Sequence, residues 1–141
     1  VLNAPIAIID KRRPEPNVAE VQNVIGDVKG KVAFIVDDLV DTAGSITEAA
    51  SILKKFDAKE VYAIATHGVL TGPAIDRIAK SELKELIITN TIDHSNKKIT
   101  DKIRVISIGP LLAEAIRRSH EGLPMGVVYE NMYKKLEKKL R

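Results

Sequence analysis

The stretch VAFIVDDLVDTAGS, residues 32–45, carries the clearest structural signal in the chain. Its continuous apolar run predicts a buried strand of a parallel sheet, ending at two adjacent acids, Asp37 and Asp38. The apolar pair Leu39-Val40 and the segment DTAGS, residues 41–45, follow, and residues 45–56 then repeat apolar side chains at helical spacing. Ligands of open α/β sheets bind where a strand ends and a loop leads into a helix. The stretch therefore predicts both the fold class and a ligand site.

The chemistry of residues 41–45 favours a phosphate ligand. Small residues let backbone N–H groups approach an anion closely, and the start of a helix adds a favourable dipole. The hydroxyls of Thr42 and Ser45 can donate hydrogen bonds to the same oxygens. Asp37 and Asp38 would repel a phosphate, so we expect them to face sugar hydroxyls or a hydrated Mg²⁺.

Two familiar nucleotide loops are excluded, because the stretch lacks both the Gly-Lys-Ser/Thr ending of a Walker A loop and the GxGxxG spacing of a dinucleotide fingerprint. A purely structural interpretation is a helix start capped by Asp or Ser after a strand that ends in two aspartates. Any one residue allows that interpretation, whereas the two acids, the apolar pair and DTAGS together favour a ligand loop.

Short runs rich in Val and Ile alternate with helical patterns along most of the chain. Several runs are continuously apolar, as in strands that are covered on both faces. We therefore expect an α/β fold with a mostly parallel, doubly wound sheet and helices on both faces. The expected strands cover residues 5–9, 32–36, 61–65, 86–88 and 105–108, and the expected helices cover residues 45–56, 73–80 and 110–119, the last burying Leu111, Leu112, Ala115 and Ile116.

Three stretches depart from this alternation. Residues 10–17 are charged and hold two prolines, which predicts a loop or a mobile arm. Residues 18–28 alternate partly, which indicates a hairpin-like excursion before the central strand. Residues 131–141, NMYKKLEKKLR, are basic and helix-prone. We expect one domain over residues 1–130 and a basic tail over residues 131–141.

The composition is typical of one soluble globular domain, with 141 residues, 45% of them hydrophobic and 29% charged. The absence of Cys excludes disulfides and thiolate metal sites, and it fits a reducing cytoplasm. No apolar run approaches the roughly 20 residues that span a bilayer. Only 4% of residues are aromatic and the net charge is a mild +3. Neither a membrane nor a nucleic acid is therefore an expected partner.

The order acid-acid, apolar pair, Asp-Thr-Ala-Gly-Ser resembles the ribose-phosphate loop of the type I phosphoribosyltransferase fold. Three further segments are similar to ribose-phosphate pyrophosphokinases, specifically to their carboxy-terminal part: IDKRRPEPNVAEVQNVIGDVKGK, VYAIATHGVLTGPAIDRI and VISIGPLLAEAIRR. The first of them resembles the mobile catalytic arm of these enzymes, which ordinary phosphoribosyltransferases lack. The likeness extends from about Ala4 to about Tyr129.

The resemblance implies an activity and a role for each matched residue. In that family the 1-hydroxyl of ribose 5-phosphate attacks the β-phosphorus of ATP, and AMP leaves. Lys11 and Arg13 match the catalytic Lys and its Arg partner, and Arg13 would also contact the substrate. Asp37 would meet the ribose hydroxyls, and Asp37 and Asp38 would contact Mg²⁺, directly or through water. The 5-phosphate would be held by Asp41, Thr42, Ala43, Gly44 and Ser45.

The resemblance also implies partners. The substrates would be ATP and ribose 5-phosphate, and the subunits would assemble, typically into hexamers with regulatory sites at their contacts. The family's amino-terminal domain, which supplies much of the nucleotide site, has no counterpart here. Because the chain opens with Val1 directly before an expected strand, we expect it to be part of something longer. By itself it should bind ribose 5-phosphate and make little or no product.

Two other functions stay open. A nucleobase phosphoribosyltransferase would need a hood that recognises the base, and no aromatic-rich candidate for one exists. A non-catalytic regulatory or binding module would be suggested by loss of Lys11 or Arg13, which are both present, although this basic run can also be an ordinary solvated surface. His67 follows an expected strand and either contacts a ligand or is a hydrogen-bonded loop residue.

Overall fold

The computed structural model describes residues 4–12 and 21–140. The chain divides into two compact units, Ala4–Ile106 and a second unit that begins at Ser107. Within the described residues, the strands and the first two helices belong to the first unit, and the last two helices belong to the second. The ligand loop expected after residue 40 therefore lies wholly within the first unit.

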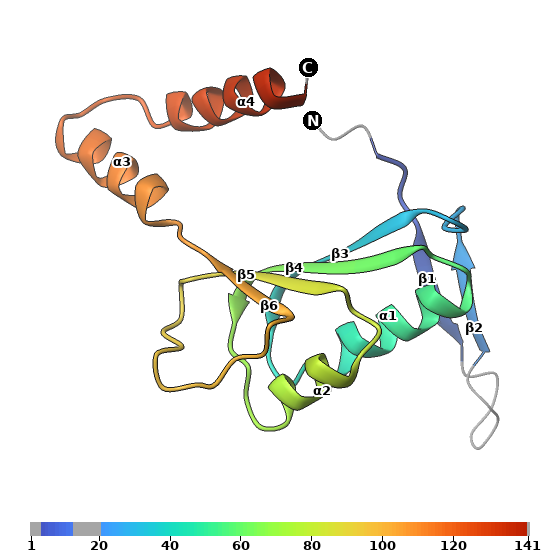
Figure 1. Cartoon of the computed structure of the whole chain (residues 1–141). Coiled ribbons are helices and arrows are strands. Elements are labelled where there is room, and N and C mark those ends of the chain that lie inside the picture. Colours follow the sequence, from blue (N-terminus) through green and yellow to red (C-terminus); the bar gives the residue numbers. More distant parts are fainter. Residues whose placement is uncertain (1–3, 13–20, 141) are drawn as a thin grey trace. The chain divides into compact units, whose positions relative to one another are not determined.

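A four-stranded parallel sheet forms the framework of the first unit (Figure 1). Its strands are β3 (Val32–Val40), β4 (Glu60–Gly68), β5 (Glu85–Thr89) and β6 (Ile103–Ile106). They are arranged in the order β3-β4-β5-β6, and each pair of neighbours is parallel. The predicted α/β fold with a parallel sheet is confirmed.

Helices α1 (Gly44–Lys55) and α2 (Ala74–Lys80) lie on the same face of this sheet (Figure 1). Strand order follows chain order, so successive right-handed crossovers place both helices on one side. Among the described residues of this unit, no helix forms the second layer expected on the opposite face. The core lies between the sheet and the two helices, and its most completely buried side chains are Ile52, Val61, Ile78, Leu83, Leu86 and Ile88.

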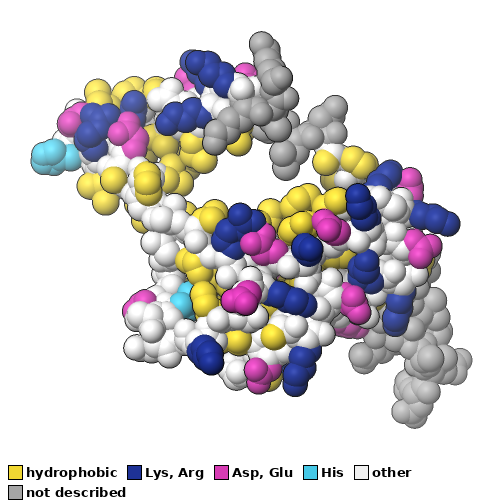
Figure 2. All heavy atoms as spheres, viewed as in Figure 1, with side chains coloured by type: hydrophobic (Ala, Val, Ile, Leu, Met, Phe, Trp, Pro, Cys, Tyr) yellow, Lys and Arg dark blue, Asp and Glu magenta, His cyan; other side chains and the backbone are white. Residues whose placement is uncertain are grey.

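The face of the sheet turned away from α1 and α2 carries exposed hydrophobic side chains (Figure 2). Val32, Phe34 and Val36 of β3 expose 45%, 58% and 77% of their surface, and Ile64 of β4 exposes 36%. The rings of Phe34 and Tyr62 stack across the two strands with centroids 5.4 Å apart. The continuous apolar run of β3 indicated a strand covered on both faces, and that expectation is wrong for residues 32–36 within this unit.

An antiparallel pair precedes the sheet. β1 (Ile8–Arg12) pairs with β2 (Val21–Ile25), with Ile8 opposite Ile25. Of the hairpin-like excursion predicted over residues 18–28, only β2 lies in that range. Its partner β1 overlaps the strand expected over residues 5–9, which therefore belongs to this separate pair and not to the parallel sheet. Residues 10–12, predicted to belong to a loop or mobile arm, are paired in β1 instead. The remainder of that predicted segment, residues 13–17, lies outside the described part of the chain.

The second unit contains α3 (Gly109–His120) and α4 (Gly126–Leu140). Pro110 stands in the first turn of α3, where its missing N–H costs no helical hydrogen bond. The expectation that α3 buries four apolar side chains is wrong, because Leu112 and Ile116 expose 51% and 70% of their surface. Helical spacing identifies an apolar stripe but does not supply a layer to cover it.

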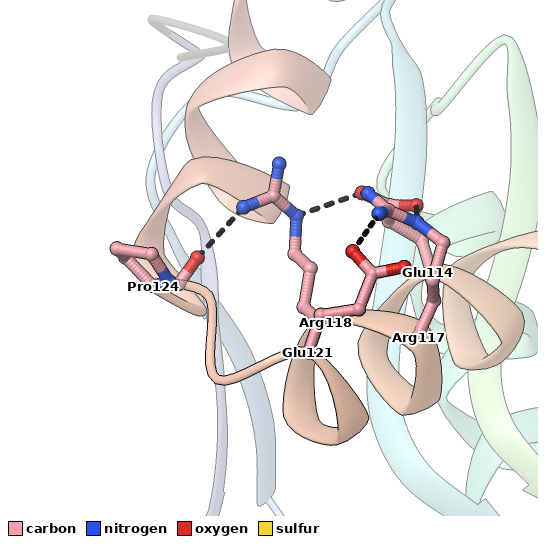
Figure 3. A network of polar contacts seen from close by, with 5 residues as sticks. All are labelled: Glu114, Arg117, Arg118, Glu121 and Pro124. Atoms are coloured by element: carbon pink, nitrogen blue, oxygen red, sulfur yellow. Dashed lines mark hydrogen bonds and ion pairs between the residues drawn. The ribbon is translucent and has the colours of Figure 1, made fainter.

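Polar contacts at the end of α3 are dense (Figure 3). Glu114 accepts hydrogen bonds from both Arg117 and Arg118, and Arg117 also pairs with Glu121. Arg118 Nη1 donates to the carbonyl of Pro124, 2.9 Å away, in the connection to α4.

Within residues 4–12 and 21–140, no helix combines the length and apolar character needed to cross a membrane.

Candidate functional site

The connection from β3 to α1 has the geometry of an anion-binding loop. Ala43, the residue before α1, has φ 59° and ψ 12°, in the left-handed region, and the helix begins at Gly44. The first intrahelical bond runs from the amide of Thr47 to the carbonyl of Ala43, over 3.2 Å. The amides of residues 42–46 donate to no acceptor among the described residues. They are therefore available to a ligand at the positive end of the helix.

The carbonyl groups of the loop are occupied by donors from the segment between β4 and α2. The amides of Leu70 and Thr71 donate to the carbonyls of Val40 and Asp41, over 3.0 and 3.1 Å. The hydroxyl of Thr71 donates to the Asp41 carboxylate. These bonds direct the carboxylate of Asp41 towards Thr71, which lessens its repulsion of an anion at the amides.

One side chain from α2 completes this set of donors. The Nη1 atom of Arg77 donates to the carbonyl of Thr42 over 3.0 Å. The four donors of Leu70, Thr71 and Arg77 thus reach three consecutive residues of the loop, Val40, Asp41 and Thr42. We call this set of donors the loop clamp.

Asp37 and Asp38 lie within β3 and not beyond its end. The strand continues to Val40 because β4 continues beside it, with Val40 opposite Gly68. Both aspartates are exposed. Each carboxylate accepts the amide of the next residue through Oδ1, over 2.9 Å for Asp37 and 2.7 Å for Asp38. In the described residues, the Oδ2 atoms accept no hydrogen bond and can meet a sugar hydroxyl or a hydrated cation.

The carboxylates of Asp37 and Asp38, which we call the acid pair, are chemically suited to bind Mg²⁺. Mg²⁺ prefers oxygen ligands, keeps several waters, and is usually held by one or two carboxylates together with substrate phosphates. Over the described ranges there is no group of three or more His, Cys, Asp or Glu side chains that could hold a metal alone. Asp37 and Asp38 therefore fit an ion that arrives with its substrate better than a resident structural ion.

Of the two basic residues expected on the catalytic arm, the structure describes only Lys11. The backbone of Lys11 pairs with Gln22 in the β1–β2 pair, and Arg13 lies outside the described residues. The structure therefore brings together the loop and the acid pair, while the approach of the arm to them remains a prediction.

His67 lies near the carboxyl end of β4, as its sequence position indicated. Its Nδ1 atom is 2.9 Å from the hydroxyl of Thr91, and both Thr89 and Thr91 donate to the carbonyl of Thr66. The contact with Thr91 agrees with the hydrogen-bonded part of the second interpretation of His67, but the residue lies within β4 and not in a loop.

Sequence reasoning missed the loop clamp. Thr71 and Arg77 lie 30 and 35 residues from their partners Asp41 and Thr42, so local spacing gives no sign of them. One signal was present: the carboxyl ends of adjacent parallel strands meet at one edge of a sheet, and TGP follows the end of the strand next to β3. Donors after residue 68 were therefore candidates.

Comparison with known proteins identifies the family of this chain. Residues 5–130 match the family described as phosphoribosyl synthetase-associated domain. The chain belongs to this family. The resemblance to ribose-phosphate pyrophosphokinases that the sequence indicated is therefore confirmed.

Two curated relatives are similar to this chain over most of its length. The ribose-phosphate pyrophosphokinase of Clostridium acetobutylicum is 59% identical over 129 residues, covering 92% of this chain and 40% of the relative. The enzyme of the same name from Bacillus subtilis is 58% identical over 120 residues, covering 85% of this chain and 38% of the relative. The chain thus spans about 40% of the length of the curated relatives it matches.

A solved structure agrees with these relatives in fold. The crystal structure of phosphoribosylpyrophosphate synthetase from Mycobacterium smegmatis superposes with a TM-score of 0.77 and 40% sequence identity. The match covers 86% of this chain and 38% of that one. The parallel sheet and its helices are therefore an arrangement that a family member adopts in a crystal.

Proposed function

We propose that the protein transfers a pyrophosphoryl group from ATP to the 1-hydroxyl of ribose 5-phosphate, giving phosphoribosyl pyrophosphate and AMP. The relatives' shared name, ribose-phosphate pyrophosphokinase, supports this reaction. In this proposal the chain supplies the ribose 5-phosphate loop and the catalytic arm. The remaining residues of the nucleotide site come from the family's amino-terminal domain, which this chain does not match.

One observation carries the proposal for this chain: the unpartnered amides between β3 and α1. The carbonyls of Val40, Asp41 and Thr42 are held by the loop clamp, while the amides of residues 42–46 have no acceptor among the described residues. A dianionic phosphate satisfies such amides without a lysine in the loop, because the helix end favours negative charge. This arrangement supports the phosphate-binding roles proposed for Thr42, Ala43, Gly44 and Ser45, while the role proposed for Asp41 rests on the family resemblance.

The acid pair then selects the sugar. With the 5-phosphate at the loop, Asp37 and Asp38 are the exposed acceptors of β3 just before it, and they can accept hydrogen bonds from ribose hydroxyls. Mg²⁺, when bound, neutralises charge that builds up on the phosphate oxygens during transfer. The two carboxylates would hold it directly or through water.

Lys11 and Arg13 are proposed to act on the phosphate oxygens on which negative charge develops during the transfer. Phosphoryl-type transfer relies on positioning and on cations placed where negative charge spreads over oxygens. A Lys supplies a point charge and an Arg a planar fork that can hold two oxygens at once. An arm that closes over the site would also exclude water, which competes with the sugar for ATP.

The oligomer, the cytoplasmic location and the use of ATP with Mg²⁺ belong to the same proposal. The oligomer and the use of ATP with Mg²⁺ rest on the family resemblance, and the absence of Cys also fits a cytoplasmic location. The proposed assembly is a hexamer of subunits that each contain both domains.

Calorimetry of the chain with ribose 5-phosphate tests the proposal at its central point. We expect saturable binding at one site, and binding of ribose at least roughly tenfold weaker, because ribose lacks the group that the amides hold. Inorganic phosphate serves as the second control, since it lacks the hydroxyls that Asp37 and Asp38 would accept. No heat with ribose 5-phosphate would remove the loop from the proposal.

A coupled assay on the protein joined to an amino-terminal domain of the family separates the possible reactions. ATP-dependent release of AMP supports pyrophosphoryl transfer. Pyrophosphate release that depends on an added base would instead indicate a nucleobase phosphoribosyltransferase. Binding of ribose 5-phosphate without any turnover would indicate a non-catalytic module of the same fold.

A further inference from the structure

Arg77 stands out because it reaches the loop from another element. It belongs to α2, and its Nη1 atom lies 3.0 Å from the carbonyl oxygen of Thr42. The same atom lies 3.6 Å from the position that a Cβ on Gly44 would take. The guanidinium group therefore sits beside the peptide units on either side of Ala43.

The hydrogen bond to Thr42 fixes the direction of the next amide. A trans peptide unit is planar and holds its C=O and N–H groups on opposite sides. The described residues contain no cis peptide bond. When Arg77 holds the carbonyl of Thr42, the N–H of Ala43 in the same peptide unit must point away from Arg77. Thr71 acts in the same way on the preceding unit, by holding the carbonyl of Asp41.

The left-handed conformation of Ala43 explains why the loop needs this restraint. Left-handed backbone costs an L-residue roughly 1–2 kcal/mol, so the loop would relax without contacts that hold it. If the Thr42–Ala43 peptide turned over, a carbonyl oxygen would face the position proposed for the phosphate.

The packing of α2 does not depend on the Arg77 side chain. Ala74 and Ile78 anchor this helix, and each is 0% exposed. The Arg77 side chain is exposed, and within the described residues its guanidinium makes no other hydrogen bond or ion pair. Its one polar partner is the loop.

We propose that Arg77 is a positioning residue for the phosphate loop: it holds the Thr42–Ala43 peptide with its amide turned towards the ligand, and its charge remains unneutralised beside the bound anion. This inference rests on the function proposed above. It assigns part of the affinity for ribose 5-phosphate to a residue of α2 that lies outside the loop.

The test compares three variants of the chain by calorimetry with ribose 5-phosphate. Arg77→Met removes both charge and donor, and we expect roughly tenfold weaker binding, the size associated with a hydrogen bond to a charged group. Arg77→Lys keeps the charge with a shorter reach and should restore part of the loss. Lys80→Met, in the same helix, removes an equal charge away from the loop and should bind like the wild type.

Backbone NMR of the ligand-free chain separates positioning from simple attraction. In Arg77→Met the amide resonance of Ala43 should move, while those of β5 stay in place, and the thermal midpoint should match that of Lys80→Met. Equal affinities for Arg77→Met and Lys80→Met would overturn the inference while leaving the phosphate loop intact. Absence of binding by the wild type would instead overturn the proposed function. If Arg77→Met does not fold, the inference fails as well, because the residue would then be structural.

Discussion

Ala43 occupies a backbone conformation that alanine seldom adopts, and it does so while 4% exposed. Its Cβ is therefore packed as well as strained. Glycine would relieve the strain but would leave a small gap, and any larger side chain would add crowding. Alanine thus balances backbone strain against packing, and in this conformation it fixes the first amides of α1 in place.

Substitution of Ala43 should separate these two effects. We expect Ala43→Val to destabilise the chain by at least about 1–3 kcal/mol, because a β-branched residue is a steric outlier at positive φ and the site has no spare volume. Ala43→Gly is the matched control and should change stability by less than about 1 kcal/mol. Urea denaturation followed by circular dichroism measures both. An unchanged midpoint for Ala43→Val would show that the loop does not hold this conformation in solution.

Strand β3 and helix α1 show what the sequence could predict. Apolar periodicity placed both within a few residues, since one face of each packs on the core through short-range spacing. The motif DTAGS likewise indicated the connection between β3 and α1, and its role as a ligand loop stays a prediction. Arg77 and Thr71 could not be found this way, because their contacts join residues 30 or more apart. The predicted burial of the apolar stripe of α3 was wrong for a related reason, since periodicity does not reveal what covers a helix.

Glu114 of α3 is expected to be sensitive to pH, because its carboxylate accepts hydrogen bonds from two arginines. Hydrogen bonds from Arg117 and Arg118 lower the pKa of Glu114 from 4.5 to about 2. Because the folded-state pKa is the lower one, the ionised carboxylate favours the folded helix. This contribution is complete above pH 4.5 and disappears as the pH falls towards 2.

Carboxyl carbon NMR of the chain measures this titration directly. We expect the Glu114 resonance to titrate with a midpoint near 2 and to shift towards 4.5 in the double variant Arg117→Met, Arg118→Met. A wild-type midpoint near 4.5 would show that the contacts of Figure 3 do not persist in solution.

At the largest scale, the main feature is the apolar surface on the face of the first unit's sheet that is turned away from α1 and α2. Val32, Phe34 and Val36 stand side by side along β3, and Ile64 continues the surface on β4. Contiguous apolar surface of this kind marks an interaction site or a tendency to associate. The relative from Clostridium acetobutylicum is about 2.3 times as long as this chain, since the 129 matched residues make up 40% of it.

The isolated chain should therefore bind a hydrophobic dye at this face. We expect Val36→Thr to lower 8-anilinonaphthalene sulfonate fluorescence, because Val36 is 77% exposed and the change replaces a methyl group with a hydroxyl. Its free energy of unfolding should stay within about 0.5 kcal/mol of the wild type, as for other surface substitutions. Ile25→Thr removes apolar surface from β2 instead, where the side chain is 54% exposed, and should leave the fluorescence nearly unchanged. Equal fluorescence for the wild type and Val36→Thr would mean that the face is covered in solution.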